Sequence, residues 1–294
     1  MTKTKLIIIL ISLASTNCGN NISESDIEFT NYPGPYIGQE LPGNISQSFI
    51  PEIFHDTHSC PVFSQDGKEV YWTAHEEIHF MEEINGAWTT PRHIKLIRSS
   101  DVEDVPFLSN DGNRLFFTAI WINSPSRNGI YYIDRIDGEW SEAVSVGNNI
   151  NNTLGHWQFS VSENGSIYYP GIEDNFHINV SKLENNTYQQ PTVLFPSIEA
   201  RFPFIDLDER FILFASSYEQ PSQPYYFRLY ICYKQEDGSW GDIYNLSELL
   251  GISDRNTICP IVSPDGNYLF FMDGGCHWIR FDQTQISNLI RNNS

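Results

Sequence analysis

The sequence has little positive charge. Its 294 residues include 17 Lys and Arg against 37 Asp and Glu, which gives a formal net charge of −20 at pH 7. Binding to nucleic acid or to an anionic membrane face needs clustered Lys and Arg. We therefore expect no nucleic-acid partner, and membrane contact only through a lipid anchor.

Long apolar runs are also missing. The run at residues 6–14 is too short to cross a bilayer, but it follows Lys3 and Lys5 as the apolar core of an export signal follows its charged region. The next residues, Ser-Thr-Asn-Cys18, resemble the lipobox of bacterial lipoproteins. We expect a signal peptide at residues 1–18 with lipidation of Cys18, an ordinary secretory signal being the alternative. Residues 19–47, rich in Asn, Ser, Gly and Pro, are expected to be a flexible tether.

Cysteines are few and show no metal-ligand spacing. None of the five forms a Cys-x-x-Cys pair, so a zinc site is not expected. Cys60 and Cys259 occupy the same position in two copies of a repeated β segment, directly before Pro61 and Pro260. A disulfide between them is one alternative, but buried free thiols are favoured because equivalent strands of neighbouring repeat units usually stand too far apart.

Sustained helical periodicity is absent, and a β repeat takes its place. Residues 260–271 contain a short apolar run ending in Ser, then Asp-Gly, then a second apolar run. This pattern predicts a hairpin, because Gly tolerates the positive φ of the turn. Further copies occupy residues 61–72 and 106–117, and degenerate copies occupy residues 159–169 and 203–214.

The spacing of the copies predicts the fold. Measured at the position of Ser64 they lie 45, 53, 44 and 57 residues apart. A second hairpin turn before Trp88, Trp140, Tyr188 and Trp240 gives each of the first four units four strands. Four-stranded units of roughly 40–50 residues are typical of propeller blades. We expect an all-β, five-bladed β-propeller at residues 48–285, with six blades as the alternative and residues 286–294 as a C-terminal tail.

The last unit lacks its fourth strand. Residues 49–54 precede the first unit as residues 90–94 precede the second, so an N-terminal strand at 49–54 is expected beside residues 276–281. This pairing would close the ring and remove exposed sheet edges. We expect a monomer.

The Ser-x-Asp-Gly hairpins resemble those of the WD-repeat-like, TolB-type β-propeller family, over most of the chain. Residues 210–216, 237–240 and 258–266 resemble a lipoprotein-rich subgroup of it. The resemblance implies a propeller that serves as a binding scaffold in the periplasm or at the outer membrane. It does not imply the role of TolB itself, because the sequence shows neither a sixth blade nor the extra domain of that protein.

One face of the ring is predicted to bind a ligand. The loops leading into the inner strands, and the inserted segments 120–129 and 217–226, belong to the face opposite the Asp-Gly turns. Loops on a rigid scaffold are where binding residues collect. The predicted ligand-binding residues are His58, Asp104, His156, Trp157, Arg201, Trp121 and Tyr218. Solvated polar residues lining any propeller channel are the structural alternative.

These residues favour binding over catalysis. Aromatic rings beside Arg and carboxylates suit a glycan or peptide. A glycan hydrolase is the second hypothesis, with candidate carboxylates at Glu76, Glu77, Glu103, Asp104, Glu173 and Asp174. A purely structural module is the third. No catalytic residue and no cofactor is assigned, although these acids together with Asp273 leave Ca²⁺ as a weak alternative.

Overall fold

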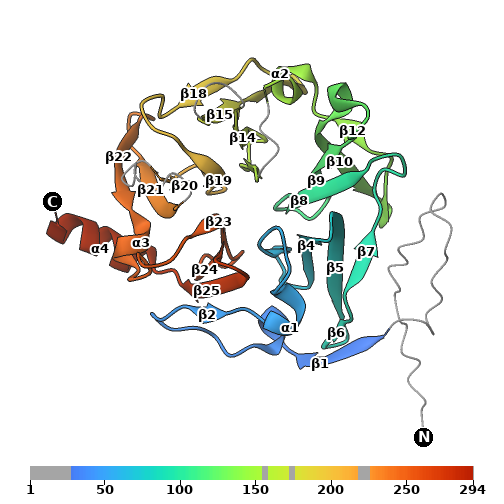
Figure 1. Ribbon diagram of the computed structural model, residues 1–294, viewed down its shortest axis with the longest axis horizontal. Coiled ribbons are helices and arrows are strands. Elements are labelled where there is room, and N and C mark those ends of the chain that lie inside the picture. Colours follow the sequence, from blue (N-terminus) through green and yellow to red (C-terminus); the bar gives the residue numbers. More distant parts are fainter. Residues whose placement is uncertain (1–27, 154–157, 172–175, 218–225, 294) are drawn as a thin grey trace, which may run out of the picture.

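The protein is a ring of five β-sheets around one axis (Figure 1). The structure is a computed structural model and describes residues 28–153, 158–171, 176–217 and 226–293. Each sheet is one blade, and its first strand lies nearest the axis. The prediction of a five-bladed, all-β propeller is confirmed.

The first two blades carry divided outer strands. Blade 1 contains β3 (Val62–Phe63), β4 (Glu69–Ala74), β5 (Glu77–Ile84), β6 (Ala87–Thr89) and β7 (Arg92–Ile94). Blade 2 contains β8 (Val102–Leu108), β9 (Arg114–Ile120), β10 (Gly129–Ile136), β11 (Glu139–Trp140) and β12 (Val144–Ser145), with η3 (Pro125–Arg127) between β9 and β10. In blade 1 the outer strand is interrupted at Pro91, which has no N–H to donate to a ladder.

The other blades follow the same order of strands. Blade 3 contains β13 (Ser160–Val161), β14 (Ile167–Pro170), β15 (Ile178–Ser181) and β18 (Thr192–Leu194), plus the hairpin of β16 (Leu183–Glu184) and β17 (Thr187–Tyr188). Blade 4 contains β19 (Arg201–Ile205), β20 (Phe211–Ser216), β21 (Arg228–Lys234) and β22 (Trp240–Asn245). Blade 5 contains β23 (Ile258–Val262), β24 (Tyr268–Met272), β25 (Cys276–Arg280) and β2 (Gln47–Ser48). Short helices α2 (Asn148–Asn151) and α3 (Leu246–Leu249) follow blades 2 and 4.

The Ser-x-Asp-Gly segments form the predicted turns. In blade 1 the Ser64 hydroxyl donates to Asp66 Oδ1 over 2.7 Å and accepts from the N–H of Glu69 over 2.9 Å. Gly67 between them has a φ of 69°, which a residue with a Cβ rarely adopts. The same Ser–Asp bond recurs at 2.6 Å in blades 2 and 5. We call this side of the ring the turn side, and the opposite side, where the inner strands begin, the mouth side.

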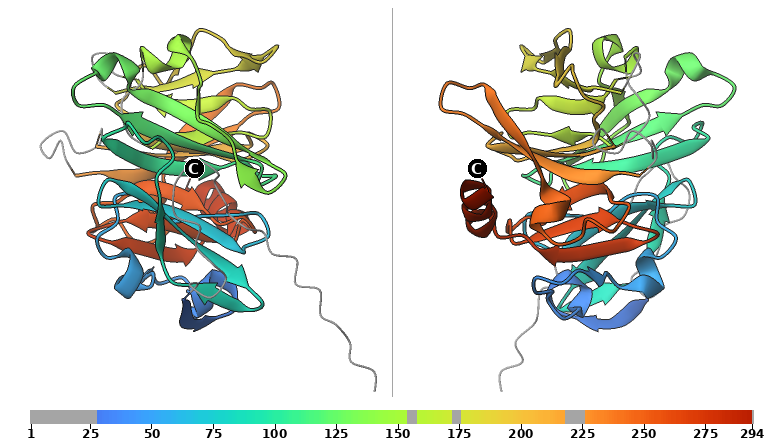
Figure 2. Two further views of the ribbon diagram at one scale, coloured as in Figure 1. Left: turned by 90° about the vertical axis from the view of Figure 1, so that its right-hand side faces the viewer. Right: turned by 60° about the vertical axis from the view of Figure 1, so that its left-hand side comes forward.

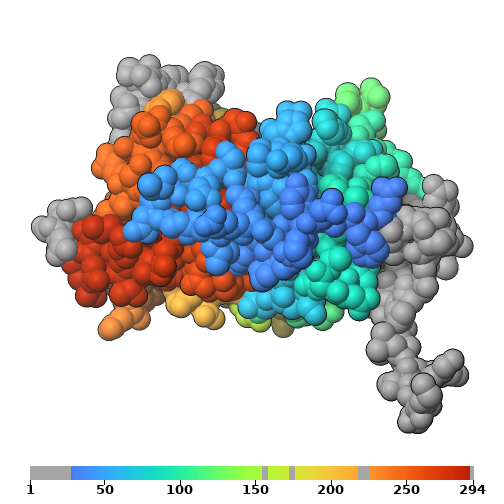
Figure 3. Space-filling model, turned by 90° about the horizontal axis from the view of Figure 1, so that it is seen from below, coloured from blue at the N-terminus to red at the C-terminus, as the bar shows by residue number. Residues whose placement is uncertain are grey.

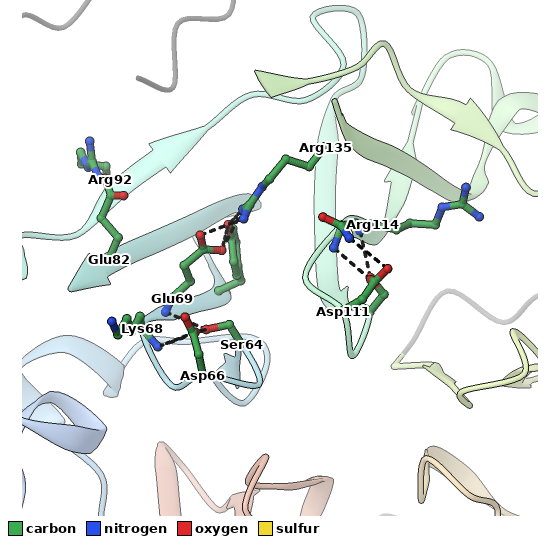
Figure 4. A network of polar contacts seen from close by, with 12 residues as sticks. Ser64, Asp66, Lys68, Glu69, Glu82, Arg92, Asp111, Arg114 and Arg135 are labelled. Atoms are coloured by element: carbon green, nitrogen blue, oxygen red, sulfur yellow. Dashed lines mark hydrogen bonds and ion pairs between the residues drawn. The ribbon is translucent and has the colours of Figure 1, made fainter. Parts of the chain in front are cut away.

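Ion pairs join neighbouring blades on the turn side (Figure 4). Arg135 of blade 2 donates to both carboxylate oxygens of Glu69 of blade 1, over 3.0 and 2.8 Å. Glu209 of blade 4 accepts from Ser162 and Asn164 of blade 3, each over 3.0 Å. Side chains of the turn side thus join blade 1 to blade 2 and blade 3 to blade 4.

The ring is closed by an N-terminal strand, but not by the predicted residues. Gln47 and Ser48 form β2 and pair with Trp278 and His277 of β25. Residues 49–54 are not a strand: the chain turns at Ile50 and forms α1 (Pro51–Phe54). Proline cannot donate to a sheet but suits the first turn of a helix, which explains the correction.

The predicted flexible tether is wrong for residues 28–47. β1 (Phe29–Pro33) pairs with β6 of blade 1, and η2 (Pro35–Gly38) places Tyr36 and the fully buried Ile37 in the core between blades 1 and 5. The Tyr36 ring contacts Phe63 of blade 1 and Tyr268 of blade 5 at centroid distances of 5.3 and 5.4 Å. Figure 3 shows this segment in blue across the rim where the two blades meet. We call residues 28–48 the strap.

The predicted C-terminal tail is also folded. Residues 283–293 form α4 (Gln283–Asn293), which lies on the outside of the ring (Figures 1 and 2). Ile286 of this helix is buried against the cluster formed by blades 4 and 5. The propeller therefore includes residues on both sides of the predicted limits of 48 and 285.

The core contains aromatic rings and free thiols. Tyr71, Phe116 and Phe270, each in the second strand of its blade, are buried. Cys60, Cys232, Cys259 and Cys276 are buried and unbonded, as favoured over a disulfide. In the part of the chain that the structure describes, no helix is long and apolar enough to cross a membrane.

Candidate functional site

The candidate site lies on the mouth side, where β8 begins beside the loop before β3. His58 is fixed by its backbone N–H, which donates to the Thr73 carbonyl at the end of β4 over 2.8 Å. Its Nδ1 lies 2.7 Å from Oδ2 of Asp104 in β8. The side chain of Asp104 is 7 % exposed and that of His58 is 65 % exposed. A buried carboxylate of blade 2 therefore orients an exposed imidazole of blade 1, leaving Nε2 toward solvent.

A bulge in β8 holds the carboxylate in this position. The register of β8 against β9 shifts between Asp104 and Phe107, and Val105 has a φ of 45°. This conformation frees the N–H of Val105 to donate to Asp104 Oδ1 over 2.8 Å and to Thr73 Oγ1 over 2.9 Å. Phe202 and Cys259 adopt similar angles in blades 4 and 5, so the bulge belongs to the repeat, but the β-branched Val105 adopts it at a cost.

The Asp104 carboxylate changes the titration of His58. Its hydrogen bond raises the pKa of His58, partial burial of the ring opposes this, and Glu76 adds a smaller increase. Because the folded pKa is raised, the pair stabilises the fold fully below the ordinary pKa of histidine and loses this contribution as the pH rises through the raised value. His58 therefore keeps its proton to a higher pH than a free imidazole.

Gln158 joins two blades that are not neighbours in the ring. Its Nε2 donates to the carbonyl of Pro260 over 2.8 Å, which links blade 3 to blade 5. The side chain is buried. The sequence prediction missed Gln158, since nothing in a single repeat indicates which side chain reaches a distant blade.

Two of the predicted binding residues are engaged in internal contacts. Arg201 forms an ion pair with Glu199 and lies over the ring of Phe176, 3.9 Å from its centroid. Trp121, a predicted ligand-binding aromatic, is buried against Tyr131 at a centroid distance of 5.6 Å. Of the predicted set, the structure brings together His58 and Asp104.

The remaining predicted residues cannot be placed. His156, Trp157 and Tyr218 lie outside the described residues, as does the predicted lipidation site Cys18. Their roles stay predictions.

Most of the described candidate carboxylates of the hydrolase hypothesis form ion pairs or hydrogen bonds within the protein. The buried Glu103 accepts from the N–H groups of Leu96 and Ile97 over 2.9 and 2.6 Å. Glu77 lies 3.8 Å from His93, and Asp104 holds His58. Glu173 and Asp174 lie outside the described residues. Among the described candidates, only Glu76 has no ion pair.

The calcium alternative gains no support. Asp273 forms an ion pair with Arg255 over 2.9 Å. Within the described ranges, no group of three or more His, Cys, Asp or Glu side chains is placed to hold a metal ion.

Histidines are concentrated on the mouth side, a pattern that the sequence prediction missed. All seven histidines of the described chain lie in mouth-side loops or in the mouth-side halves of strands: His55, His58, His75, His79, His93, His177 and His277. Placing each histidine relative to the Asp-Gly turns could have revealed it. The charge of this face therefore changes with pH near neutrality more than that of the turn side.

Known proteins share the fold of this chain but little of its sequence. No family model and no curated protein matches it. A putative TolB from Agrobacterium tumefaciens is 19 % identical with a TM-score of 0.52, over 74 % of this chain and 70 % of that one. TolB from Acinetobacter baumannii is 14 % identical with a TM-score of 0.50, over 76 % of this chain and 54 % of that one.

A gluconolactonase from Xanthomonas campestris is 10 % identical with a TM-score of 0.50, over 85 % of this chain and 98 % of that one. Two of these solved structures are named TolB and the third is a gluconolactonase, and one fold carries many functions. At these identities the likeness concerns architecture alone. The chain therefore shares the β-propeller fold of these proteins.

Proposed function

We propose that this protein is an exported, lipid-anchored binding module of the bacterial cell envelope that holds a glycan or protein partner on its mouth side. The signal-like residues 1–18 and the lipobox-like Cys18 support export and anchoring, in the periplasm or at the outer membrane. The TolB-type fold is consistent with a binding scaffold.

The observation that carries the proposal is the pair of His58 and Asp104. Burying the carboxylate of Asp104 costs free energy, and an ion pair with a histidine as exposed as His58 adds little to the stability of the fold. The pair does however fix the orientation of a donor on a rigid scaffold, which lowers the entropy lost on binding. An oriented donor at the mouth is what a ligand site requires.

The test is a glycan and peptide array probed with the wild type and with His58→Ala. We expect the variant to bind its ligand about tenfold or more weakly, since a hydrogen bond to a charged group is worth roughly 1.5–3 kcal/mol. Asp104→Asn should weaken binding as well, by lowering the pKa of His58 and loosening the ring. Thermal melting of each variant separates lost binding from lost folding.

His55→Ala is the matched control. His55 also lies on the mouth side and also pairs with an aspartate, Asp56, over 3.1 Å, but both partners are exposed. We expect this variant to bind like the wild type. Equal binding by His58→Ala and the wild type would place the site elsewhere.

A further inference from the structure

We propose that the ligand of the mouth side carries a carboxylate group, which Arg98 and Arg127 of blade 2 bind. This inference rests on the proposed function and names the chemistry of its ligand. Neither Arg98 nor Arg127 is among the ligand-binding residues predicted from the sequence.

Arg98 and Arg127 lack the partners that most arginines of this chain have. The arginines that contact a carboxylate are Arg92, Arg114, Arg135, Arg201, Arg210, Arg255 and Arg280. Among the described residues, no carboxylate lies within ion-pair distance of Arg98 or Arg127, and both are exposed. In a chain with a net charge of −20, two exposed arginines without an acidic partner in adjoining loops need an explanation.

Both arginines belong to the surroundings of Ser99, Arg98 as the preceding residue and Arg127 through a side-chain contact. Arg98 precedes Ser99 in the loop between β7 and β8, and Arg127 reaches it from the inserted loop between β9 and β10. Arg127 Nη2 lies 3.5 Å from Ser99 Oγ, and Trp121 Nε1 lies 3.4 Å from the same oxygen. Both loops belong to the mouth side of blade 2, the blade that also supplies Asp104.

The inserted loop holds Arg127 in place. The guanidinium lies over the Trp121 ring, 4.1 Å from its centroid, and the Arg127 carbonyl accepts from the Tyr131 hydroxyl over 2.8 Å. The backbone N–H of Trp121 donates in turn to Asn128 Oδ1 over 2.6 Å. Trp121 therefore acts as a buried support, and its ring fixes a planar donor whose outer face remains open. Such a guanidinium suits bidentate binding of a carboxylate at low entropic cost.

The charge of the chain limits the kind of anion. A net charge of −20 repels polyanions such as nucleic acid or a fully charged acidic polymer. Most of that charge is screened beyond about 8–10 Å at physiological salt, so a compact group with a single charge experiences mainly its local surroundings. Asp101 is the acid nearest to Arg98 in sequence. Its Oδ2 accepts from the N–H of Ile122 over 2.7 Å, and it forms no ion pair with Arg98 or Arg127. An isolated carboxylate fits this setting better than a phosphate-rich or polymeric anion.

The experiment compares probes that differ only in the carboxylate. One pair is the methyl glycoside of galacturonic acid and the neutral methyl glycoside of galactose, and the other is a short peptide without acidic side chains that has a free or an amidated C-terminus. Titration calorimetry at low and at high salt is expected to show binding of a charged member at least about tenfold tighter than its neutral partner, weakening with salt. The pair that shows the difference in affinity identifies whether the carboxylate of the ligand belongs to a sugar acid or to a peptide C-terminus.

The variants are Arg98→Gln and Arg127→Gln, with Arg228→Gln as the matched control. Arg228 also lies over an aromatic ring, Tyr226, at 4.1 Å on the mouth side, but its Nη1 donates to the carbonyls of Arg255 and Phe227 over 2.8 and 3.3 Å. Each test variant should abolish the preference for the charged member, and Arg228→Gln should keep it. Arg127→Lys should recover part of it if Arg127→Gln proves unstable.

Three results would overturn the carboxylate inference. The charged and neutral members of each pair could bind equally well, or both charged probes could fail to bind at millimolar concentration. Arg228→Gln could also lose the preference for the charged member as fully as Arg98→Gln and Arg127→Gln do. None of these results would overturn the proposed function, which is decided separately by the array and His58→Ala.

Discussion

A chain truncated to begin at residue 49 is expected to melt about 10 °C or more below a chain that begins at residue 28. The truncation removes the strap, with the buried Ile37, the partly buried Tyr36 and the pairing of β2 with β25. Full burial of one such side chain and partial burial of the other contribute roughly 2–5 kcal/mol, and the lost strand pairing adds to this. For a domain of this size each kcal/mol corresponds to about 2–4 °C in the melting temperature.

The loss should be global. Without the strap, β25 becomes an exposed edge strand and blades 1 and 5 lose the ring of Tyr36 between them, so light scattering should also reveal association through that edge. The chain beginning at residue 28 is the control, since it keeps the strap. Coincident melting curves for the two chains would mean that the strap is not part of the closure.

Replacing Glu103 by Ala is expected to destabilise the protein by about 3–5 kcal/mol, as measured by urea unfolding. The Glu103 side chain is 0 % exposed and also accepts from the Ser100 hydroxyl over 2.9 Å, beside its two backbone donors. Its removal leaves buried N–H groups without an acceptor and releases the loop that carries Arg98. Glu103→Gln, which retains one acceptor oxygen, should lose less.

Glu76→Ala is the comparison for this result. Glu76 is an exposed neighbour on the same side, and its removal should change the free energy of unfolding by no more than about 0.5 kcal/mol. A Glu103→Ala variant as stable as Glu76→Ala would show that Glu103 is not the structural acceptor and would reopen its role as a reactive carboxylate.

The fold was predictable because its information is local and repeated. Ser64, Asp66 and Gly67 specify one turn, and the recurrence of that turn specifies the blades and their number. The strap was not predictable, because its Asn, Ser, Gly and Pro content resembles a tether, while its order depends on where Tyr36 and Ile37 meet two distant blades.

The candidate site was predictable only in part. Repeat equivalence placed His58 and Asp104 at the starts of neighbouring inner strands, which suffices to bring them together. It could not show that Trp121 turns inward to support Arg127, because burial depends on how the inserted loop folds back over blade 2. Gln158 and Arg98 depend in the same way on contacts that no single repeat encodes.

The central claim is that the mouth side binds the ligand through His58, and histidine-selective NMR tests it most directly. The chain has eight histidines, and the seven described ones all lie on that side. With ¹³C-labelled histidine, the His58 signal, assigned through His58→Gln, is titrated against pH with and without the ligand that the array identifies. We expect saturating ligand to shift this signal and to raise the pKa of His58, because a ligand oxygen that accepts a hydrogen bond from the ring stabilises the imidazolium. A ligand that saturates the protein while the shift and the pKa of His58 stay unchanged would contradict the account.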